Sequence, residues 1–142
     1  MLVKRAEQAM VRAKSAALKS VGLTPSQYVA LFELDRQPGI TAATLARACL
    51  ITPQAMMILL KTMEQQGLIT RSSHPRHPNV LELHMTETGR EALHAGRGRV
   101  EPIERRVFGA FPPKDMVAFR EFLSRFIAAF EAGVTSKNAR RD

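Results

Sequence analysis

Residues 41–71, TAATLARACLITPQAMMILLKTMEQQGLITR, contain two helical patterns in close succession. The first covers residues 41–50. The second, over residues 53–66, begins at Thr52-Pro53, because threonine caps helices and proline suits the first helical position. A connection of only about three residues forces the two helices to cross sharply, and this crossing defines a helix-turn-helix motif.

The second of these helices, here called the recognition helix, has two different sides. An apolar stripe at helical spacing faces inward and consists of Met56, Leu59, Leu60 and Met63. In a helix-turn-helix motif the second helix enters the major groove of DNA, with its N-terminal residues at the base edges. We therefore expect Gln54 to read adenine and Met57 or Ile58 to pack on thymine methyl groups. The candidate DNA contacts on this helix are Thr52, Gln54, Ala55, Met57, Ile58, Lys61 and Thr62.

After the recognition helix the spacing of apolar residues changes from a helical pattern to a strand pattern, which predicts a β-hairpin. Residues 68–70 form a short strand and residues 80–85 a second, while SSHPRHPN, residues 72–79, is a polar loop with two prolines. Helices followed by such a hairpin indicate a winged helix-turn-helix. The expected fold class is therefore mainly α with a small β-hairpin wing. The candidate DNA contacts of the wing are Arg71, Arg76 and His77.

Helical patterns also flank this module. Residues 2–20 are rich in alanine and lack glycine and proline, and Thr24-Pro25 starts another helix. On the C-terminal side we expect a long helix over about residues 87–109, irregular near Pro102, and a last helix over about residues 113–132. The expected organisation is a helical dimerisation body from residues 1–22 and 87–134, a DNA-binding module over residues 23–86, and a flexible basic tail over residues 135–142.

Large apolar side chains on the last helix predict a dimer. One helical face carries Phe119, Phe122, Phe126 and Phe130. A single helix at the end of a small domain cannot bury all four rings locally, so we expect them to form an interface between two copies of the chain. The alternative is that the rings line a ligand cavity.

The composition is that of a globular protein with a basic excess. The 142 residues carry a formal net charge of +8, which points to a polyanionic partner, chiefly nucleic acid or an anionic membrane surface. No apolar run is long enough to span a membrane, and MLVKRAEQAM at the N-terminus has charges where an export signal needs apolar residues. We therefore expect a cytoplasmic protein without membrane contact. We also expect no enzymatic activity and no cofactor, because the sequence has no glycine-rich phosphate loop and no nucleophile elbow.

Four segments between Leu23 and Gly89 follow one another as LTPSQYVALFEL, TLARACLITPQAM, LLKTMEQQGLITR and LHMTETGR. In this order and spacing they resemble the MarR family of bacterial transcription regulators. The family segments Leu-Ala…Leu-Ile-Thr-Pro and Leu-Glu-x-x-Gly-Leu-Ile-x-Arg are well matched, with Met63 in the usual leucine position. The resemblance implies a homodimer on palindromic operator DNA, usually a repressor, often released by a small aromatic or amphipathic ligand.

The wing departs from the family pattern. Family wings usually read Asp-Pro-x-Asp-Arg-Arg, with the last arginine in the minor groove, whereas residues 74–79 here read HPRHPN. Both acids and the paired arginines are absent, so Arg76 or Arg71 would have to substitute. The recognition helix also has Ile58 where relatives often have arginine. These departures motivate an alternative, a ligand- or protein-binding module on a degenerate winged scaffold without specific DNA binding.

The resemblance also implies a place for a small-molecule effector, between the body helices and the winged module. The candidate residues are Met10, Lys14, Tyr28 and Phe32. Tyr28 is the only tyrosine and offers an apolar ring with a hydroxyl group. The alternative is that these side chains belong to ordinary core packing.

Histidine and cysteine suggest two further sites, neither of which we expect. His74 and His77, with His84 nearby, resemble zinc ligands, but a zinc site needs three or four ligands and the nearest acid is Glu82. Cys49 lies on the apolar face of the helix over residues 41–50, where a thiol is inert packing rather than a redox sensor.

Overall fold

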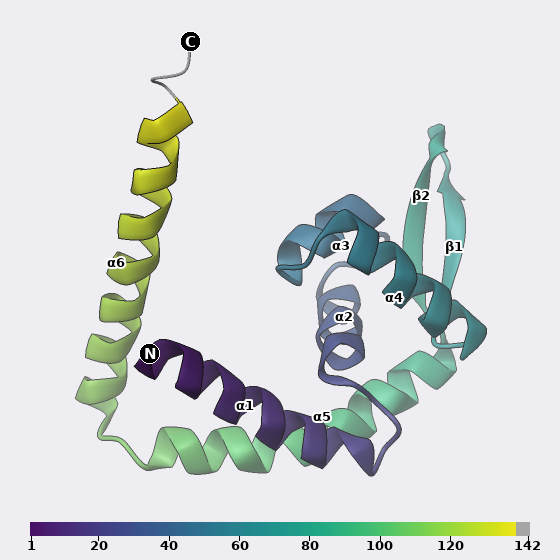
Figure 1. The fold of residues 1–142 in the computed structure, drawn as a ribbon. Coiled ribbons are helices and arrows are strands. Elements are labelled where there is room, and N and C mark those ends of the chain that lie inside the picture. The colour runs from purple at the N-terminus through teal and green to yellow at the C-terminus, as the bar shows by residue number, and fades with distance from the viewer. Residues whose placement is uncertain (139–142) are drawn as a thin grey trace. The chain divides into compact units, whose positions relative to one another are not determined.

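The computed structural model of the protein describes residues 1–138, which form helices and one two-stranded antiparallel sheet (Figure 1). The elements are α1 (Leu2–Lys19), α2 (Pro25–Arg36), α3 (Ala42–Ala48), α4 (Pro53–Gln65), β1 (Ile69–His74), β2 (His77–Met85), α5 (Glu87–Gly109) and α6 (Pro113–Asn138). This arrangement confirms the mainly α fold with a small β-hairpin wing.

The chain forms two compact units, one over Met1–Ile103 and one from Glu104 onward. The division falls inside α5, one residue after Pro102. By this division α1 and most of α5 belong with the winged module, whereas the sequence grouped residues 1–22 with residues 87–134. The functional separation of a dimerisation body from a DNA-binding module stays a prediction.

Helices α3 and α4 cross at 108° over a short break, within the range of a helix-turn-helix motif. The Thr52 hydroxyl caps α4 by accepting a hydrogen bond from the Ala55 amide at 3.1 Å. Helix α3 ends at Ala48, two residues before the expected end, because Leu50 adopts the left-handed conformation with φ of 57°. No single helix in the described part of the chain is long and apolar enough to cross a membrane, and α3 with α4 reaches that length only across the bend.

The core of the first unit holds α4 against α2, α3 and the base of the wing. The expected inward stripe of the recognition helix is confirmed, since Met56, Leu60 and Met63 are buried and Leu59 packs against them in part. The other large side chains that are fully buried are Leu18, Leu31, Leu34, Leu45, Leu83 and Val100. Burial of its inner face fixes α4 and leaves its outer face to solvent.

The wing is longer and more regular than the sequence predicts. The expected eight-residue loop is wrong: β1 continues to His74, β2 begins at His77, and only two residues connect them. Regular pairing runs from Ile69↔Met85 to Ser73↔Leu81 and then shifts to His74↔His77. The shift leaves residues 78–80 outside regular pairing. Pro78 is tolerated there because it has no N–H to donate and both strands of a two-stranded sheet have an open edge.

Helix α6 extends to Asn138, beyond the expected end near residue 132. No proline follows Pro113, and the isolated Gly133 costs a helix only about 1 kcal/mol relative to alanine. The first four residues of the expected flexible tail, residues 135–138, are therefore helical, and residues 139–142 lie outside the described residues.

Candidate nucleic-acid interface

The outer face of α4 carries all of the expected contacts of the recognition helix. The structure exposes Thr52, Gln54, Ala55, Met57, Ile58, Lys61 and Thr62. Met57 and Ile58 are 48% and 65% exposed, although both are large apolar side chains. Such exposure on the outside of a well-packed helix suits contact with a partner surface.

At the N-terminus of α4 the backbone amide of Gln54 is available as a hydrogen-bond donor. The amides of Ala55 and Met56 are bonded to the Thr52 hydroxyl and carbonyl, and Pro53 has no amide hydrogen. The Gln54 amide has no partner in the described part of the chain, so it can donate to an external acceptor. A free amide at a helix N-terminus favours a phosphate group.

Two polar side chains farther along α4 differ in whether their polar group is free to contact a partner. The Thr62 hydroxyl donates to the Ile58 carbonyl at 3.2 Å, so its hydrogen is already used within the helix. Lys61 is exposed and forms no ion pair with another described residue. Lys61 is therefore the cation that this face can place on DNA.

The three expected wing contacts fall in two places. Arg76 and His77 are exposed at the tip, where the Arg76 amide donates to His74 Nδ1 at 3.1 Å and the rings of His74 and His77 stack at 5.2 Å. Arg71 lies on β1 and forms an ion pair with Glu64 of α4 at 2.7 Å. Sequence reasoning missed this role of Glu64, which the Glu-x-x-Gly-Leu-Ile-x-Arg spacing across the turn could have suggested.

Glu82 lies between two of the three wing histidines. Its carboxylate is 3.5 Å from His74 Nε2 and 3.2 Å from His84 Nε2. The sequence identified Glu82 only as the acid nearest to these histidines. The hairpin register places its carboxylate between the rings of His74 and His84. Among the described residues, no group of three or more histidine, cysteine or acidic side chains could hold a metal ion.

The four candidate effector residues lie on two helices, Met10 and Lys14 on α1 and Tyr28 and Phe32 on α2. Tyr28 is buried and its ring lies against Gly96 of α5, where an added Cβ would come within 2.8 Å of Tyr28 Cδ2. Phe32 lies at the surface with the Arg97 guanidinium 5.6 Å from its ring centroid. This placement agrees with the core-packing interpretation for Tyr28, and effector contact by Met10, Lys14, Tyr28 and Phe32 stays a prediction.

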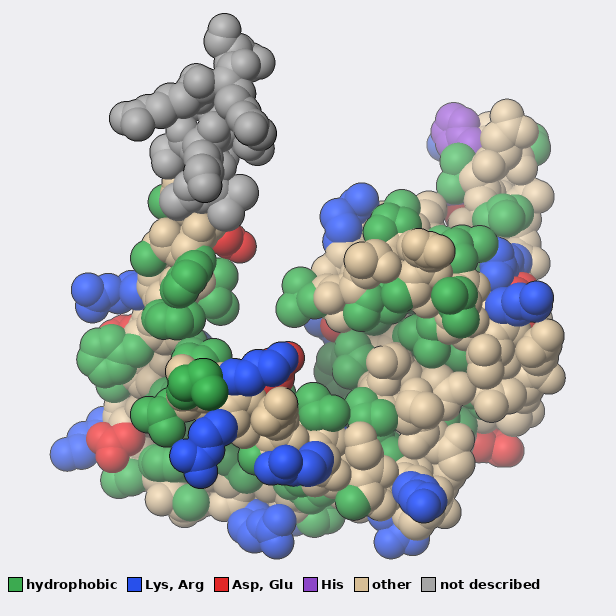
Figure 2. Space-filling view, viewed as in Figure 1, with side chains coloured by type: hydrophobic (Ala, Val, Ile, Leu, Met, Phe, Trp, Pro, Cys, Tyr) green, Lys and Arg blue, Asp and Glu red, His purple; other side chains and the backbone are tan. Residues whose placement is uncertain are grey.

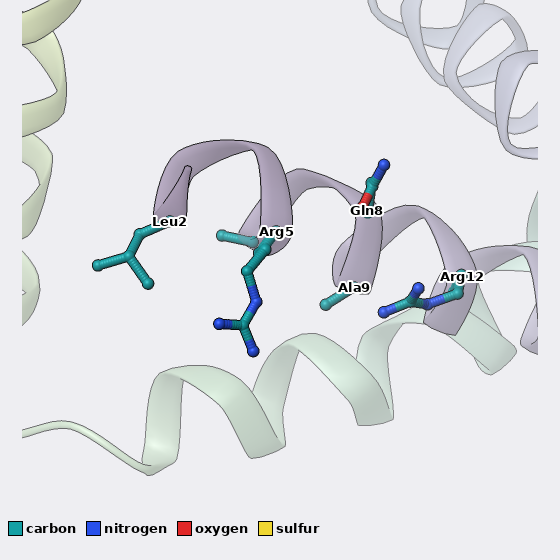
Figure 3. A pocket seen from close by; sticks show the side chains of 6 residues that line it. Leu2, Arg5, Gln8, Ala9 and Arg12 are labelled. Atoms are coloured by element: carbon teal, nitrogen blue, oxygen red, sulfur yellow. The ribbon is translucent and has the colours of Figure 1, made fainter.

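Hollows on α1 are lined by other residues. One of about 570 Å³ is lined by Leu2, Arg5, Ala6, Gln8, Ala9 and Arg12. Figure 3 shows Leu2, Arg5 and Arg12 along one side of α1, while Gln8 points away from them. A second hollow, of about 340 Å³, is lined by Lys4, Glu7, Gln8, Val11 and Arg12. Neither includes Met10 or Lys14.

The phenylalanine face of α6 is open to solvent in the second unit. Figure 2 shows hydrophobic side chains along this helix. The exposed members are Phe119, Phe122, Phe126 and Phe130, with Leu123 and Ile127 beside them. The rings of Phe126 and Phe130 lie 4.9 Å apart. A contiguous apolar face of this kind marks an interaction surface.

The thiol of Cys49 has a raised pKa, which lowers its reactivity. Burial raises the pKa of Cys49 to about 11, and the nearby negative charge of Glu33 contributes in the same direction. The thiol is therefore protonated near neutral pH, as expected for packing rather than redox sensing.

Cys49 should alkylate slowly in the folded protein. At pH 8 the raised pKa lowers the thiolate fraction about a hundredfold, and the greater nucleophilicity of the thiolate recovers about tenfold, so a rate about tenfold below that of an unfolded cysteine is expected. Iodoacetamide labelling followed by mass spectrometry measures this rate. Denatured protein is the control, and equal rates in the two states would contradict the protected thiol.

Known proteins share this organisation. The model of the MarR family matches residues 21–77. The HTH-type transcriptional repressor Rv2887 of Mycobacterium tuberculosis is 31% identical over 111 residues, which cover 78% of this chain and 80% of that protein. The chain belongs to the MarR family. It is thus a transcriptional regulator of the winged helix-turn-helix type, and MarR-family proteins are regulators rather than enzymes.

Solved structures agree with the fold. The Rv2887 structure in complex with salicylic acid has a TM-score of 0.68 at 29% identity, and the match covers 88% of this chain and 93% of that one. CouR from Rhodococcus jostii RHA1, bound to p-coumaroyl-CoA, has a TM-score of 0.80 at 24% identity and covers 88% of each chain. A further structure shows CouR on a 23-mer DNA duplex, with a TM-score of 0.76 at 24% identity over 89% of each chain.

Proposed function

We propose that this MarR-family regulator is a homodimeric, sequence-specific repressor that acts in the cytoplasm. The observation that carries the proposal is the outer face of α4. There Met57 and Ile58 are exposed, and neither the Gln54 amide nor the Lys61 ammonium has a partner among the described residues. Affinity for phosphate comes from the amide and the cation, and discrimination between bases comes from the Gln54 side chain and the apolar pair.

The exposed face of α6 supports the dimer. Two copies of the winged module would read two half-sites about one turn of DNA apart, roughly 34 Å, which requires a palindromic operator. Repression would be steric, because a dimer bound at a promoter excludes the polymerase. The repressor name of Rv2887 and the DNA-bound CouR structure support this part of the proposal.

A small aromatic or amphipathic ligand would release the repressor. The relatives in complex with salicylic acid and with p-coumaroyl-CoA support this ligand class. Such a ligand can lower operator affinity only if it binds more tightly to the conformation that does not fit DNA. No catalytic step, cofactor or metal is part of this proposal.

Two substitutions on α4 separate affinity from specificity. Lys61→Ala is expected to weaken binding to operator and random DNA alike, because it removes a phosphate contact. Gln54→Ala is expected to change base preference, with a loss of about 1–3 kcal/mol at the base pair that it reads. Fluorescence anisotropy with operator variants and a scrambled duplex measures both effects. Equal losses on operator and scrambled DNA for Gln54→Ala would refute its reading role.

The altered wing favours a second candidate, a ligand- or protein-binding module without specific DNA binding. Of the expected wing cations, Arg71 is tied to Glu64 and Arg76 remains at the tip. A gel shift of the full chain with its own upstream intergenic DNA separates the two candidates. A sequence-specific repressor still shifts the upstream DNA when scrambled competitor DNA is in excess. Equal binding to the upstream and scrambled DNA would favour the second candidate.

A further inference from the structure

An ion pair joins the recognition helix to the wing. Arg71 Nη2 of β1 lies 2.7 Å from Glu64 Oε2 in the last turn of α4. The side chains of Arg71 and Glu64 are only 21% and 34% exposed, so solvent screens the pair less than a surface pair. Arg71 Nε is buried without a hydrogen-bond partner among the described residues, which shows how far the guanidinium is drawn into the protein.

The chain between the two residues is short and held at several points. It turns at Gly67, whose φ is 70°. The Thr86 hydroxyl donates to the Gly67 carbonyl at 2.6 Å, and the Thr86 amide donates to the Leu68 carbonyl at 3.0 Å. The same hydroxyl accepts a hydrogen bond from the Gly89 amide of α5 at 3.0 Å. These bonds hold the turn, Leu68 and Ile69 anchor the start of β1 in the core, and the ion pair adds a link between α4 and β1 two residues farther along the strand.

The charge of Arg71 is already balanced. A guanidinium held by a carboxylate at this distance brings no net charge to the duplex, so it releases no counterions on binding. Lys61 and Arg76, by contrast, are exposed and form no ion pair with another described residue. Lys61 on the outer face of α4 and Arg76 at the wing tip can therefore approach phosphate without breaking an ion pair, whereas Arg71 cannot.

We propose that Arg71 is a positioning residue, which through Glu64 sets the angle between the wing and the recognition helix and does not itself contact phosphate. This role rests on the proposed DNA binding. With the angle fixed, α4 and the wing tip can engage the same stretch of duplex at once, and less ordering is needed on binding. Removal of either partner frees the wing to move against α4.

Substitution of Glu64 distinguishes positioning from direct contact by the direction of its effect. For a positioning pair, Glu64→Ala weakens operator binding by roughly threefold to tenfold, because the wing loses its alignment. For an Arg71–phosphate contact, the same change tightens binding, because it frees the guanidinium and removes a negative charge near DNA. Glu64→Gln keeps an acceptor in the same place and is expected to weaken binding less than Glu64→Ala.

Salt dependence gives an independent measurement. The double variant Glu64→Gln/Arg71→Gln removes both charges of the pair and is expected to leave the slope of log K against log salt unchanged, whereas Arg76→Gln flattens it by about 0.9 for each phosphate that is no longer neutralised. A flatter slope for the double variant would overturn the positioning role, because it would show that the Arg71 guanidinium neutralises a phosphate. Glu87→Ala is the matched control, because it removes the acid of a more exposed pair with Arg90 at 2.8 Å and is expected to leave operator affinity unchanged.

Amide hydrogen exchange on the free full-length protein tests the pair without DNA. Glu64→Ala is expected to speed exchange in β1 and β2 by about tenfold and to leave α2 unchanged, and Glu87→Ala should change neither. Unchanged wing exchange overturns the proposal even if DNA binding is intact. If the wild type binds no operator, the proposed function and the role in DNA binding fail together, and the exchange result still shows whether the pair holds the wing.

Discussion

The double substitution Phe122→Glu/Phe126→Glu is expected to convert the proposed dimer into monomers. Both rings lie on the exposed apolar face of α6. An interface that buries them would lose their apolar contribution and would have to bury unpaired carboxylates. A loss of roughly 3 kcal/mol or more follows, which raises the dissociation constant of the dimer more than a hundredfold. Sedimentation velocity over a range of concentrations measures this change.

Ser124→Glu is the control for the dimer. Ser124 is exposed on the side of α6 away from the four rings by helical spacing, and it does not line the hollow formed by Phe122, Arg125, Phe126, Ala128 and Ala129. The control is expected to stay dimeric. If the double variant also sediments as a dimer, the interface lies elsewhere and the rings serve another purpose, such as the ligand cavity considered above.

Gly89→Ala is expected to destabilise the fold by about 3 kcal/mol, with a melting temperature lower by roughly 10 °C. Gly89 is buried in the first turn of α5, where an added Cβ would collide with the Leu68 carbonyl and lie 2.7 Å from Met85 Cγ. The obstacle is largely backbone, which a rotamer change cannot remove. Thermal unfolding followed by circular dichroism at fixed protein concentration measures the effect.

Gly98→Ala in the same helix provides the opposite case. Within the described residues, no atom that would obstruct an added Cβ lies within 4 Å of it at this position. Alanine is also the better helix former, so a gain of about 0.5–1 kcal/mol is expected. Both variants replace glycine by alanine in α5, but only Gly89 has a close contact. The difference between their melting temperatures therefore reports the effect of that contact and not of helix propensity. A melting temperature for Gly89→Ala equal to that of the wild type would contradict the contact.

Local signals predicted most of the winged module. Thr52-Pro53 marks the start of α4 because the cap and the proline act within one turn of helix. The spacing of Met56, Leu60 and Met63 identifies the buried side, and the residues between them identify the exposed side. The same reasoning failed for the wing, where two prolines in residues 72–79 indicated a loop although the open edges of a two-stranded sheet accept them.

Contacts between distant parts of the chain were not predictable in this way. The charge of Arg71 is visible in sequence but its partner Glu64 is not, so the DNA contact predicted for Arg71 took no account of this ion pair. The Tyr28 hydroxyl is visible in sequence, whereas Gly96, against which its ring packs, lies far along the chain; effector contact by Tyr28 stays a prediction. Local spacing identifies which face of a helix a residue occupies but does not identify the residue that it meets.

Thr86 joins the turn after α4 to the first turn of α5. Its hydroxyl and amide hold the turn after α4, and the hydroxyl also holds the first turn of α5. These hydrogen bonds connect the start of α5 directly to the end of the recognition helix, so the two segments are expected to move together. A rotation of the first turn of α5 should therefore reach the end of α4 through the Thr86 hydrogen bonds and tilt α4 on the DNA that it is proposed to bind.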